Sequence, residues 1–286
     1  MIRYRTRGEK IFDAFNYFSL GAIAIVMLAP LLYVIAGSFS ATGMAGGFTK
    51  FSLSAYRFIT SSNALIKSTL NSVYITIVGT AINMFFTTVT AYVLSKKYLV
   101  GRGILMKIVV FFMLFSPGLI PLFIVVDKVG LMNSYWALWI PGAISAYNMI
   151  VMKNFFQAIP ESVEESAKID GCNDLVVFIR IVLPLSSAAL ATIGLFYAVS
   201  HWNNYFNALI YIKDQMKWPV QVWLRQIVVL SVGGFSERDN LSEFANVPSD
   251  SVKYAVIVLS TIPIIMIYPF LQKHFTKGVM LGSVKG

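Results

Sequence analysis

Neutral polar and aromatic side chains gather at the end of one long hydrophobic run of this 286-residue chain. Aromatic rings stack on the apolar faces of pyranoses and amides bond sugar hydroxyls, so these residue types suit the lining of a sugar path. The candidates in this run are Tyr197, His201, Trp202, Asn203, Asn204 and Tyr205, and weaker candidates elsewhere are Asn83, Tyr147 and Asn148. An interfacial aromatic belt explains the first set about as well, and hydrogen bonding between helices explains the second set better.

The side chains that catalysis or metal binding needs do not occur at suitable spacings. Neither His201 nor His274 has a second histidine or an acid at metal-ligand spacing. No Gly-x-Ser-x-Gly elbow supports a hydrolase, and no Gly-x-x-x-x-Gly-Lys-Ser/Thr sequence could hold a nucleotide phosphate. We therefore predict no catalytic residue, no metal site and no cofactor bound by this chain.

The composition indicates a membrane protein that crosses the bilayer several times. Hydrophobic residues make up 57% of the chain and charged residues only 13%, about half the usual share of a soluble domain. The net charge of +10 comes from basic residues scattered beside hydrophobic runs, a pattern typical of membrane flanks and not of nucleic-acid binding. The single cysteine, Cys172, excludes an internal disulfide.

The hydrophobic runs predict an all-α membrane protein with six transmembrane helices, forming a single domain over residues 1–286. The spans are expected at about residues 13–37, 68–95, 104–126, 134–157, 184–206 and 252–273, with a polar loop at 158–183 and a long outer loop at 207–251. Fourteen of the 23 Lys and Arg residues lie in the short segments assigned to the inside, which places both termini and the polar loop in the cytoplasm. Ionisable residues are almost absent from the spans, so an ion gradient is not the expected energy source.

The polar loop at residues 158–183 contains start and stop signals for a short helix. Pro160 suits a first helical turn, and Glu161, Glu164 and Glu165 follow near the positive end of the helix dipole. Gly171 can close the helix in a left-handed conformation. Because so short a helix is only marginally stable alone, we expect it to dock on something else.

The same loop resembles the EAA loop of ABC importer permeases. Glu165-Ser166-Ala167 is followed after three residues by Gly171, and after nine more by Ile181-x-Leu183-Pro184, which is the spacing of that motif. Nearly the whole chain is similar to the second permease of carbohydrate ABC importers of the maltose type, in the subgroup associated with complex oligo- and polysaccharides. In this family the loop is the coupling helix, which lies in a groove of a separate ATPase subunit.

The resemblance implies both site residues and partners. The ATPase-coupling residues it implies are Glu164, Glu165, Ser166, Ala167, Asp170, Gly171 and Pro184, with Lys285 and Gly286 as tail contacts to the ATPase. A disordered end explains the tail equally well. The implied partners are a second homologous permease, an ATPase dimer that binds ATP and Mg²⁺, and an extracytoplasmic solute-binding protein, in the lipid bilayer of the bacterial cytoplasmic membrane. Alternative interpretations are an importer permease for a non-sugar solute, a membrane-embedded enzyme and a scaffold subunit.

Overall fold

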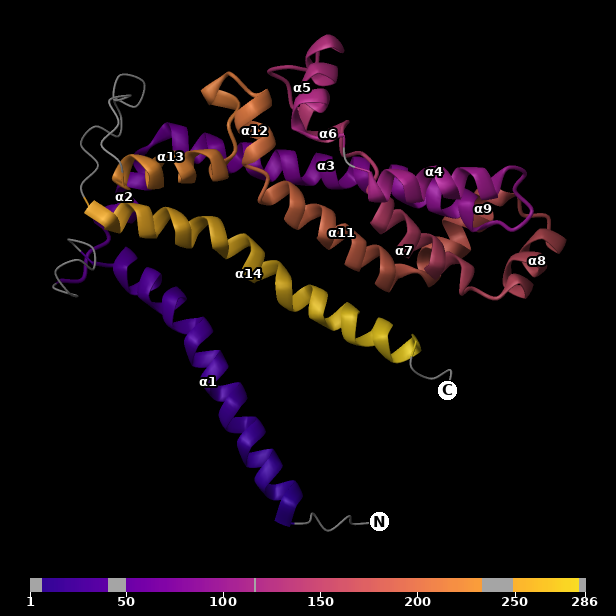
Figure 1. The fold of residues 1–286 in the computed structure, drawn as a ribbon, viewed down its shortest axis with the longest axis horizontal. Coiled ribbons are helices and arrows are strands. Elements are labelled where there is room, and N and C mark those ends of the chain that lie inside the picture. The colour runs from indigo at the N-terminus through magenta and orange to yellow at the C-terminus, as the bar shows by residue number, and fades with distance from the viewer. Residues whose placement is uncertain (1–6, 41–49, 116, 233–248, 283–286) are drawn as a thin grey trace. The chain divides into compact units, whose positions relative to one another are not determined.

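The computed structural model describes residues 7–40, 50–115, 117–232 and 249–282, and within these ranges the regular structure is helical, as predicted. The only pairing of extended residues in the described ranges is an isolated bridge between Ser40 and Phe51. The chain divides into two compact units (Figure 1), of which one combines Met1–Asn63 with Gln226–Thr261 and the other combines Ala64–Arg225 with Ile262–Gly286.

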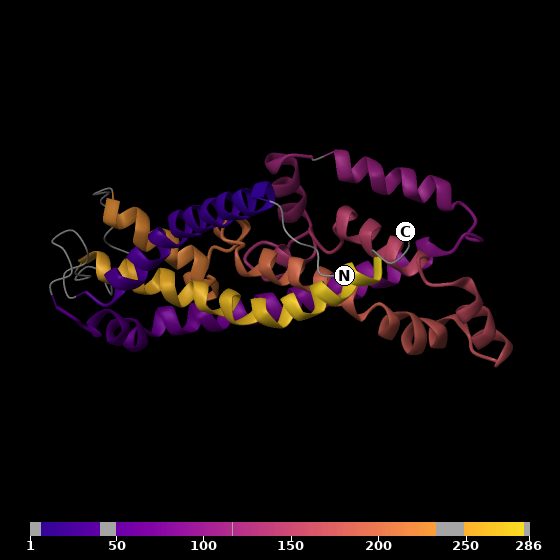
Figure 2. The same ribbon diagram turned by 90° about the horizontal axis from the view of Figure 1, so that it is seen from below.

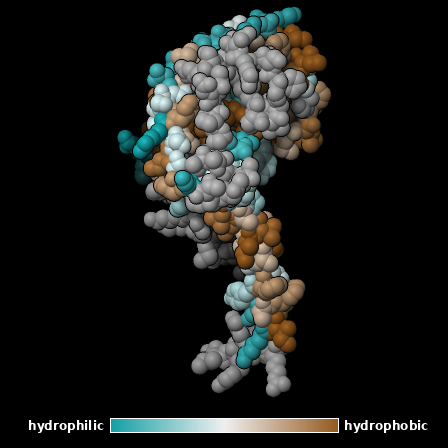
Figure 3. Space-filling view, turned by 90° about the vertical axis from the view of Figure 1, so that its left-hand side faces the viewer, coloured by the Kyte–Doolittle hydropathy of each residue, from teal (hydrophilic) through white to brown (hydrophobic). Residues whose placement is uncertain are grey.

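The first unit is built around α1 (Arg7–Ser38), α2 (Ser54–Ser61) and the first turns of α14 (Ser249–Gly282). The hydrophobic side chains of α1 are exposed along its length, and its surface is largely hydrophobic in Figure 3. At the end of α1, the Ser38 hydroxyl lies 2.8 Å from the Tyr56 hydroxyl, and the Ser251 hydroxyl donates to the Ser40 carbonyl at 2.6 Å. Polar contacts therefore join the three elements where α1 ends.

The second unit is organised along α3 (Asn63–Ser95), a single helix of 33 residues. Its other helices are α4 (Arg102–Leu114), α5 (Leu119–Lys128), α6 (Trp136–Trp139), α7 (Ala146–Gln157), α8 (Glu161–Ile169), α9 (Asp174–Val177), α10 (Leu183–Leu185), α11 (Ser187–Trp202) and α12 (Phe206–Tyr211), with a π-helix, η1 (Phe178–Val182), and a 3₁₀ turn, η2 (Gln215–Lys217). The last helix, α13 (Val220–Val232), begins in this unit, and its residues from Gln226 on belong to the first unit. In both ribbon views (Figure 1 and Figure 2), α8 lies at the same end of this unit as the start of α4.

Two hydrophobic cores form at different heights along α3. One surrounds Ile75 in the first half of the helix and is completed by Trp139 of α6, Tyr211 of α12 and Val222 of α13. The other surrounds the last turns of α3 and is completed by residues of α7, α8, η1 and α11. Burial of these side chains, each favoured by roughly 1.5–3 kcal/mol, fixes the short helices against α3.

Interruptions divide three of the predicted spans. The third span consists of α4 and α5, which are bent by 114° at a break that contains Pro117. The fifth, predicted at 184–206, is interrupted near its start: the helical segment Asp174–Leu185, most of which was predicted to lie in the polar loop, meets α11 at a bend of 83°. Pro184 lies in α10 before the bend, and α11 begins at Ser187. The fourth consists of α6 and α7, separated by residues 140–145, where Pro141 lacks a backbone donor.

The described residues include three helices that are long and hydrophobic enough to cross a membrane, or five if each bent pair counts as one span. These are the helices predicted as the first, second and sixth spans, together with the bent third and fifth spans. The fourth span is not among them because of its break. The six-span topology and the side of the membrane on which the termini lie stay predictions.

Candidate functional site

Helix α8 begins and ends at the residues whose types predicted its limits. Pro160 is the N-cap, with a φ of −58° and a ψ of 132°, one position before the first turn where it was expected. Gly171 has a φ of 85°, the left-handed conformation expected for it. The amide of Cys172 donates to the Ala167 carbonyl at 2.9 Å and the amide of Gly171 to the Lys168 carbonyl at 3.0 Å. This pair of bonds is a Schellman motif, which satisfies carbonyls at the helix end.

One side of α8 packs against the rest of the second unit, and the other side is exposed. Ala167 is buried in the core at the end of α3, and the Ser166 hydroxyl donates to the Ser162 carbonyl within the helix. Ile169, in contrast, is 85% exposed although it is a large hydrophobic residue, at the last position of α8. Glu165 and Asp170 are exposed too. An exposed hydrophobic side chain between exposed carboxylates is a suitable contact surface for another protein.

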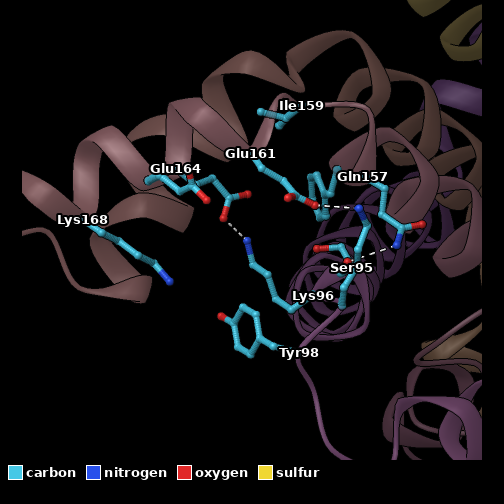
Figure 4. Close-up of a pocket in the computed structure, with 11 residues that line it drawn as sticks. Ser95, Lys96, Tyr98, Gln157, Ile159, Glu161, Glu164 and Lys168 are labelled. Atoms are coloured by element: carbon cyan, nitrogen blue, oxygen red, sulfur yellow. Dashed lines mark hydrogen bonds and ion pairs between the residues drawn. The ribbon is translucent and has the colours of Figure 1, made fainter.

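Between α8 and the end of α3 lies a cleft of about 380 Å³, here called the α8 cleft. Its lining residues are Ser95, Lys96, Lys97, Tyr98, Phe156, Gln157, Ile159, Glu161, Glu164, Glu165 and Lys168. Figure 4 shows the Lys96 amine pointing across the cleft to the Glu164 carboxylate, with which it forms an ion pair. A second pair joins the Lys97 amine to the Glu161 carboxylate at 2.7 Å.

Two charged groups of the α8 cleft have pKa values that are shifted by the partner in their ion pair. The hydrogen bond from Lys97 holds the pKa of the Glu161 carboxyl below its usual value. The Lys168 amine lies 2.8 Å from the Asp174 carboxylate, and this bond raises the pKa of Lys168. Both shifts favour the charged forms, so the ion pairs are present at neutral pH.

Hydrogen bonds join the last turns of α3 to three other elements. Gln157, at the end of α7, donates to the Ser95 carbonyl at 3.1 Å, and Arg102, at the start of α4, donates to the Leu94 carbonyl at 2.9 Å. The Tyr92 hydroxyl donates to the Asp174 carbonyl of α9 at 3.3 Å. The end of α3 therefore joins the segments on both sides of α8.

A second polar cluster, here called the polar ladder, lies in the middle of α3 and closes the break between α6 and α7. In its first rung, the Asn83 amide donates to the carbonyls of Gly142 and Ala143 at 2.5 and 3.0 Å, and its oxygen lies 2.5 Å from His201 Nε2. These carbonyls lack helical partners because the span is broken there. Asn83 supplies the missing contacts and, through its bond with His201, links α3, the break and α11.

The second rung lies one helical turn from the first on both α3 and α11. The Tyr197 hydroxyl lies 2.7 Å from Thr87 Oγ1 and accepts a hydrogen bond from the Ser145 amide at 3.0 Å. The Ser145 hydroxyl in turn accepts a hydrogen bond from the backbone amide of Asn148, which is buried. The structure thus brings together three predicted pathway residues, Asn83, Tyr197 and His201, as partners in contacts between segments, whereas the bond of Asn148 is the N-terminal cap of α7.

The other predicted pathway residues lie outside the ladder. Trp202 is buried, and the Tyr205 hydroxyl accepts a hydrogen bond from Arg225 at 2.7 Å. Asn203 bonds the Val199 carbonyl of its own helix, and Asn204 accepts from the Asn207 amide. Tyr147 is 60% exposed. The tail residues Lys285 and Gly286 lie outside the described residues.

Sequence reasoning missed three residues that the two clusters use. Lys96 appeared only as a flanking charge, and Thr87 and Ser145 gave no signal in the sequence, since a hydroxyl among hydrophobic residues is common in membrane helices. Within the described part of the chain, no group of three or more His, Cys, Asp or Glu side chains could hold a metal ion.

A helical membrane protein with broken spans and a capped, exposed helix beside its longest span has the architecture of a transporter permease. Residues 88–281 match the family described as the binding-protein-dependent transport system inner membrane component, and the chain belongs to this family. The resemblance stated from the sequence is thereby confirmed. The family consists of permease subunits, so no enzymatic activity is assigned to this chain.

Relatives of known name cover almost the whole chain. The polygalacturonan/rhamnogalacturonan transport system permease protein YtcP of Bacillus subtilis (strain 168) is 51% identical, over 97% of this chain and 99% of its own length. Protein LplC of the same bacterium is 46% identical, over 99% of this chain and 98% of its own.

A solved structure agrees with the fold. A chain in the crystal structure of a bacterial ABC transporter involved in the import of the acidic polysaccharide alginate is 33% identical. It superposes with a TM-score of 0.87 and covers 96% of this chain and 99% of its own.

Proposed function

We propose that this chain is the membrane-spanning permease subunit of an ATP-driven importer, and that it translocates an oligo- or polysaccharide delivered by an extracytoplasmic binding protein. The family, the 51% identity with a permease named for polygalacturonan and rhamnogalacturonan, and the likeness to an alginate importer support this function. The six predicted spans would form one transporter domain in the bacterial cytoplasmic membrane, with both termini in the cytoplasm.

The observation that carries the proposal is helix α8. It begins after the N-cap Pro160, ends in a Schellman motif and is held by ion pairs at the end of α3. It has an exposed side that carries Glu165 and Ile169, four residues apart, and Asp170 is exposed next to Ile169. We propose that this exposed side is the surface that an ATPase subunit contacts. Binding of ATP and Mg²⁺ by the ATPase dimer would then move α8, and the spans joined to it would switch between inward-open and outward-open forms.

The partners follow from the same proposal. A second homologous permease would complete the path, as the resemblance to importers that pair two different permeases implies. A crystal structure of a bacterial alginate ABC transporter with a similar fold contains a periplasmic protein bound to an alginate pentasaccharide, which supports an extracytoplasmic binding protein as the source of the sugar. Of the predicted pathway residues, we propose Tyr147 and Asn203 as candidates for sugar contact, because their side chains are exposed.

Transport assays on the assembled complex test this function. The chain would be co-expressed with its neighbouring permease, ATPase and binding protein, purified and reconstituted in proteoliposomes with ATP inside. We expect uptake of labelled galacturonan or rhamnogalacturonan oligosaccharides and no uptake of labelled amino acids or phosphate. Uptake of an amino acid or phosphate without sugar uptake would replace the proposal by the non-sugar alternative.

A further inference from the structure

The ion pair between Lys96 and Glu164 is the most enclosed charged contact of the α8 cleft. The Lys96 side chain is 11% exposed and that of Glu164 18%, whereas Lys97 and Glu161 in the neighbouring pair are 75% and 70% exposed. An exposed ion pair contributes little because water screens it. An enclosed pair resists separation, because each partner would be left as a charge without its counter-ion in a poorly hydrated site.

Lys96 directly follows Ser95, the last residue of α3, and its side chain is held against that helix. Its amine lies 4.1 Å from the centre of the Tyr92 ring, one helical turn earlier on α3. Tyr92 packs on Phe178 of η1 with ring centres 4.7 Å apart, and on Phe156 of α7 at 6.3 Å. Tyr92 of α3 and Lys96, which follows α3, therefore contact α8 itself, the helix before it and the segment after it.

The same helix carries the polar ladder at its middle. Asn83 and Thr87, both on α3, bond the break between α6 and α7 and the side chains of α11. A displacement of α8 that keeps the Lys96 contact must displace the end of α3. A displacement of α3 in turn acts on the ladder, whose contacts are short and directional.

We propose that Lys96 is the positioning residue that makes α8 and α3 move together, and thereby transmits the movement of the ATPase to the broken spans. This inference rests on the proposed function, since it assumes that α8 contacts an ATPase. It adds a residue outside the EAA-like loop to the coupling apparatus. Lys97, which differs from Lys96 by one position, has no such role.

The test compares four variants of the full reconstituted complex. Lys96→Met removes the charge and keeps an unbranched stem over the Tyr92 ring, and Lys97→Met is the matched control at the exposed pair. Lys96→Arg keeps the charge, and the double variant Lys96→Glu with Glu164→Lys exchanges the two charges. The measured quantity is sugar taken up per ATP hydrolysed, which a defect in folding or assembly alone would leave unchanged.

We expect Lys96→Met to lower this ratio about tenfold, with ATP hydrolysis retained, since directly paired residues couple on this scale. Lys97→Met should keep the ratio, and Lys96→Arg should keep most of it. The charge exchange should recover part of the ratio lost in Lys96→Met. An unchanged ratio in Lys96→Met, or an equal loss in both Met variants, would overturn the proposal.

Cross-linking separates this inference from the function on which it rests. The free Cys172 is first replaced by Ser, and a single reactive thiol is then placed on α8 by the substitution Ser162→Cys at an exposed position. If this thiol cross-links to the ATPase in every variant while Lys96→Met keeps a normal ratio, the Lys96 inference fails and the proposed function stands. If the thiol does not cross-link to the ATPase even with Lys96 present, the assignment of α8 fails, and the Lys96 inference fails with it.

Discussion

The polar ladder and the α8 cleft lie along the same helix but use different chemistry. The ladder, at the middle of α3, contains only neutral groups that bond each other or the backbone, through Asn83, Thr87, Tyr197 and His201. The cleft, at the end of α3, contains lysines and glutamates whose pairs range from enclosed to open. Neutral groups bonded within the protein are tolerated in hydrocarbon, whereas ion pairs suit a site near water.

This contrast indicates that the two clusters have different roles in the protein. The ladder compensates for a break in a predicted span and so stabilises a single arrangement of α3, α7 and α11. The cleft holds the short helix α8 by contacts through which the movement of a partner can be transmitted. We therefore expect substitutions in the ladder to affect folding most, and substitutions at α8 to affect transport more than stability.

The largest expected effect is that of Asn83→Leu, which breaks the first rung. The carbonyls of Gly142 and Ala143 and the imidazole of His201 would lose their partner in a buried site. We expect a loss of about 3 kcal/mol of stability, since each unpaired buried group costs roughly 1–3 kcal/mol. Thermal unfolding of the purified complex in detergent measures it. Equal loss in the control Tyr147→Leu, at an exposed side chain, would contradict a stabilising role for the rung.

The next largest effect is expected for Gly79→Ala. A Cβ at Gly79 would lie 2.6 Å from His201 Nε2, so the imidazole must leave the rung. We expect a destabilisation of about 2 kcal/mol, as for other overpacked sites. Gly194→Ala is the matched control, because a Cβ there meets only Met84 Sδ at 3.7 Å. If both variants unfold at the same temperature, the rung does not depend on the close approach of α3 and α11.

Gly171→Val tests the other region. A Cβ at this position meets no atom within 4 Å, so the cost is that of holding a β-branched residue at a φ of 85°. This strain is of order 1–3 kcal/mol and should be relieved by loosening the end of α8. We expect uptake per ATP hydrolysed to fall while the complex still assembles, and Gly171→Asn, which tolerates the left-handed conformation, to be milder. Normal coupling in Gly171→Val would show that the cap is not needed for transport.

The smallest effect is expected for Glu161→Gln at the exposed pair. The Lys97 hydrogen bond lowers the pKa of Glu161, so any stabilisation by the carboxylate is present above its unfolded pKa and is lost as the pH falls through the lowered value. At neutral pH we expect no measurable change in the unfolding temperature, because the pair is exposed. A clear drop would mean that the two ion pairs of the cleft are not as different as their exposure indicates.

Local signals in the sequence predicted where the helices lie better than they predicted the contacts between the helices. Pro160 and Gly171 lie at the limits of α8 because a missing donor and a left-handed backbone are properties of single residues. The hydrophobic runs likewise predicted the long helices α1, α3 and α14. The break between α6 and α7 was not expected, although Pro141 lies in it, because a proline in a hydrophobic run is compatible with a kinked but continuous span.

The polar ladder could not be predicted because its partners are distant in the sequence. Asn83 bonds residues 59 and 60 positions away, and Lys96 pairs with a residue 68 positions away. The sequence identified Asn83, Tyr197 and His201 as polar residues in hydrophobic surroundings, which is what they are. It did not indicate that they bond one another, since that depends on how α3, α7 and α11 pack.

A structure of the assembled importer, determined by cryo-electron microscopy, would decide whether α8 is the contact between this chain and its ATPase. We expect α8 on the cytoplasmic side, with Glu165 and Ile169 in a groove of the ATPase subunit and the pair between Lys96 and Glu164 intact. If α8 instead lies on the outer side of the membrane, or contacts no other subunit in the assembly, it is not the coupling helix and the proposed mechanism is wrong.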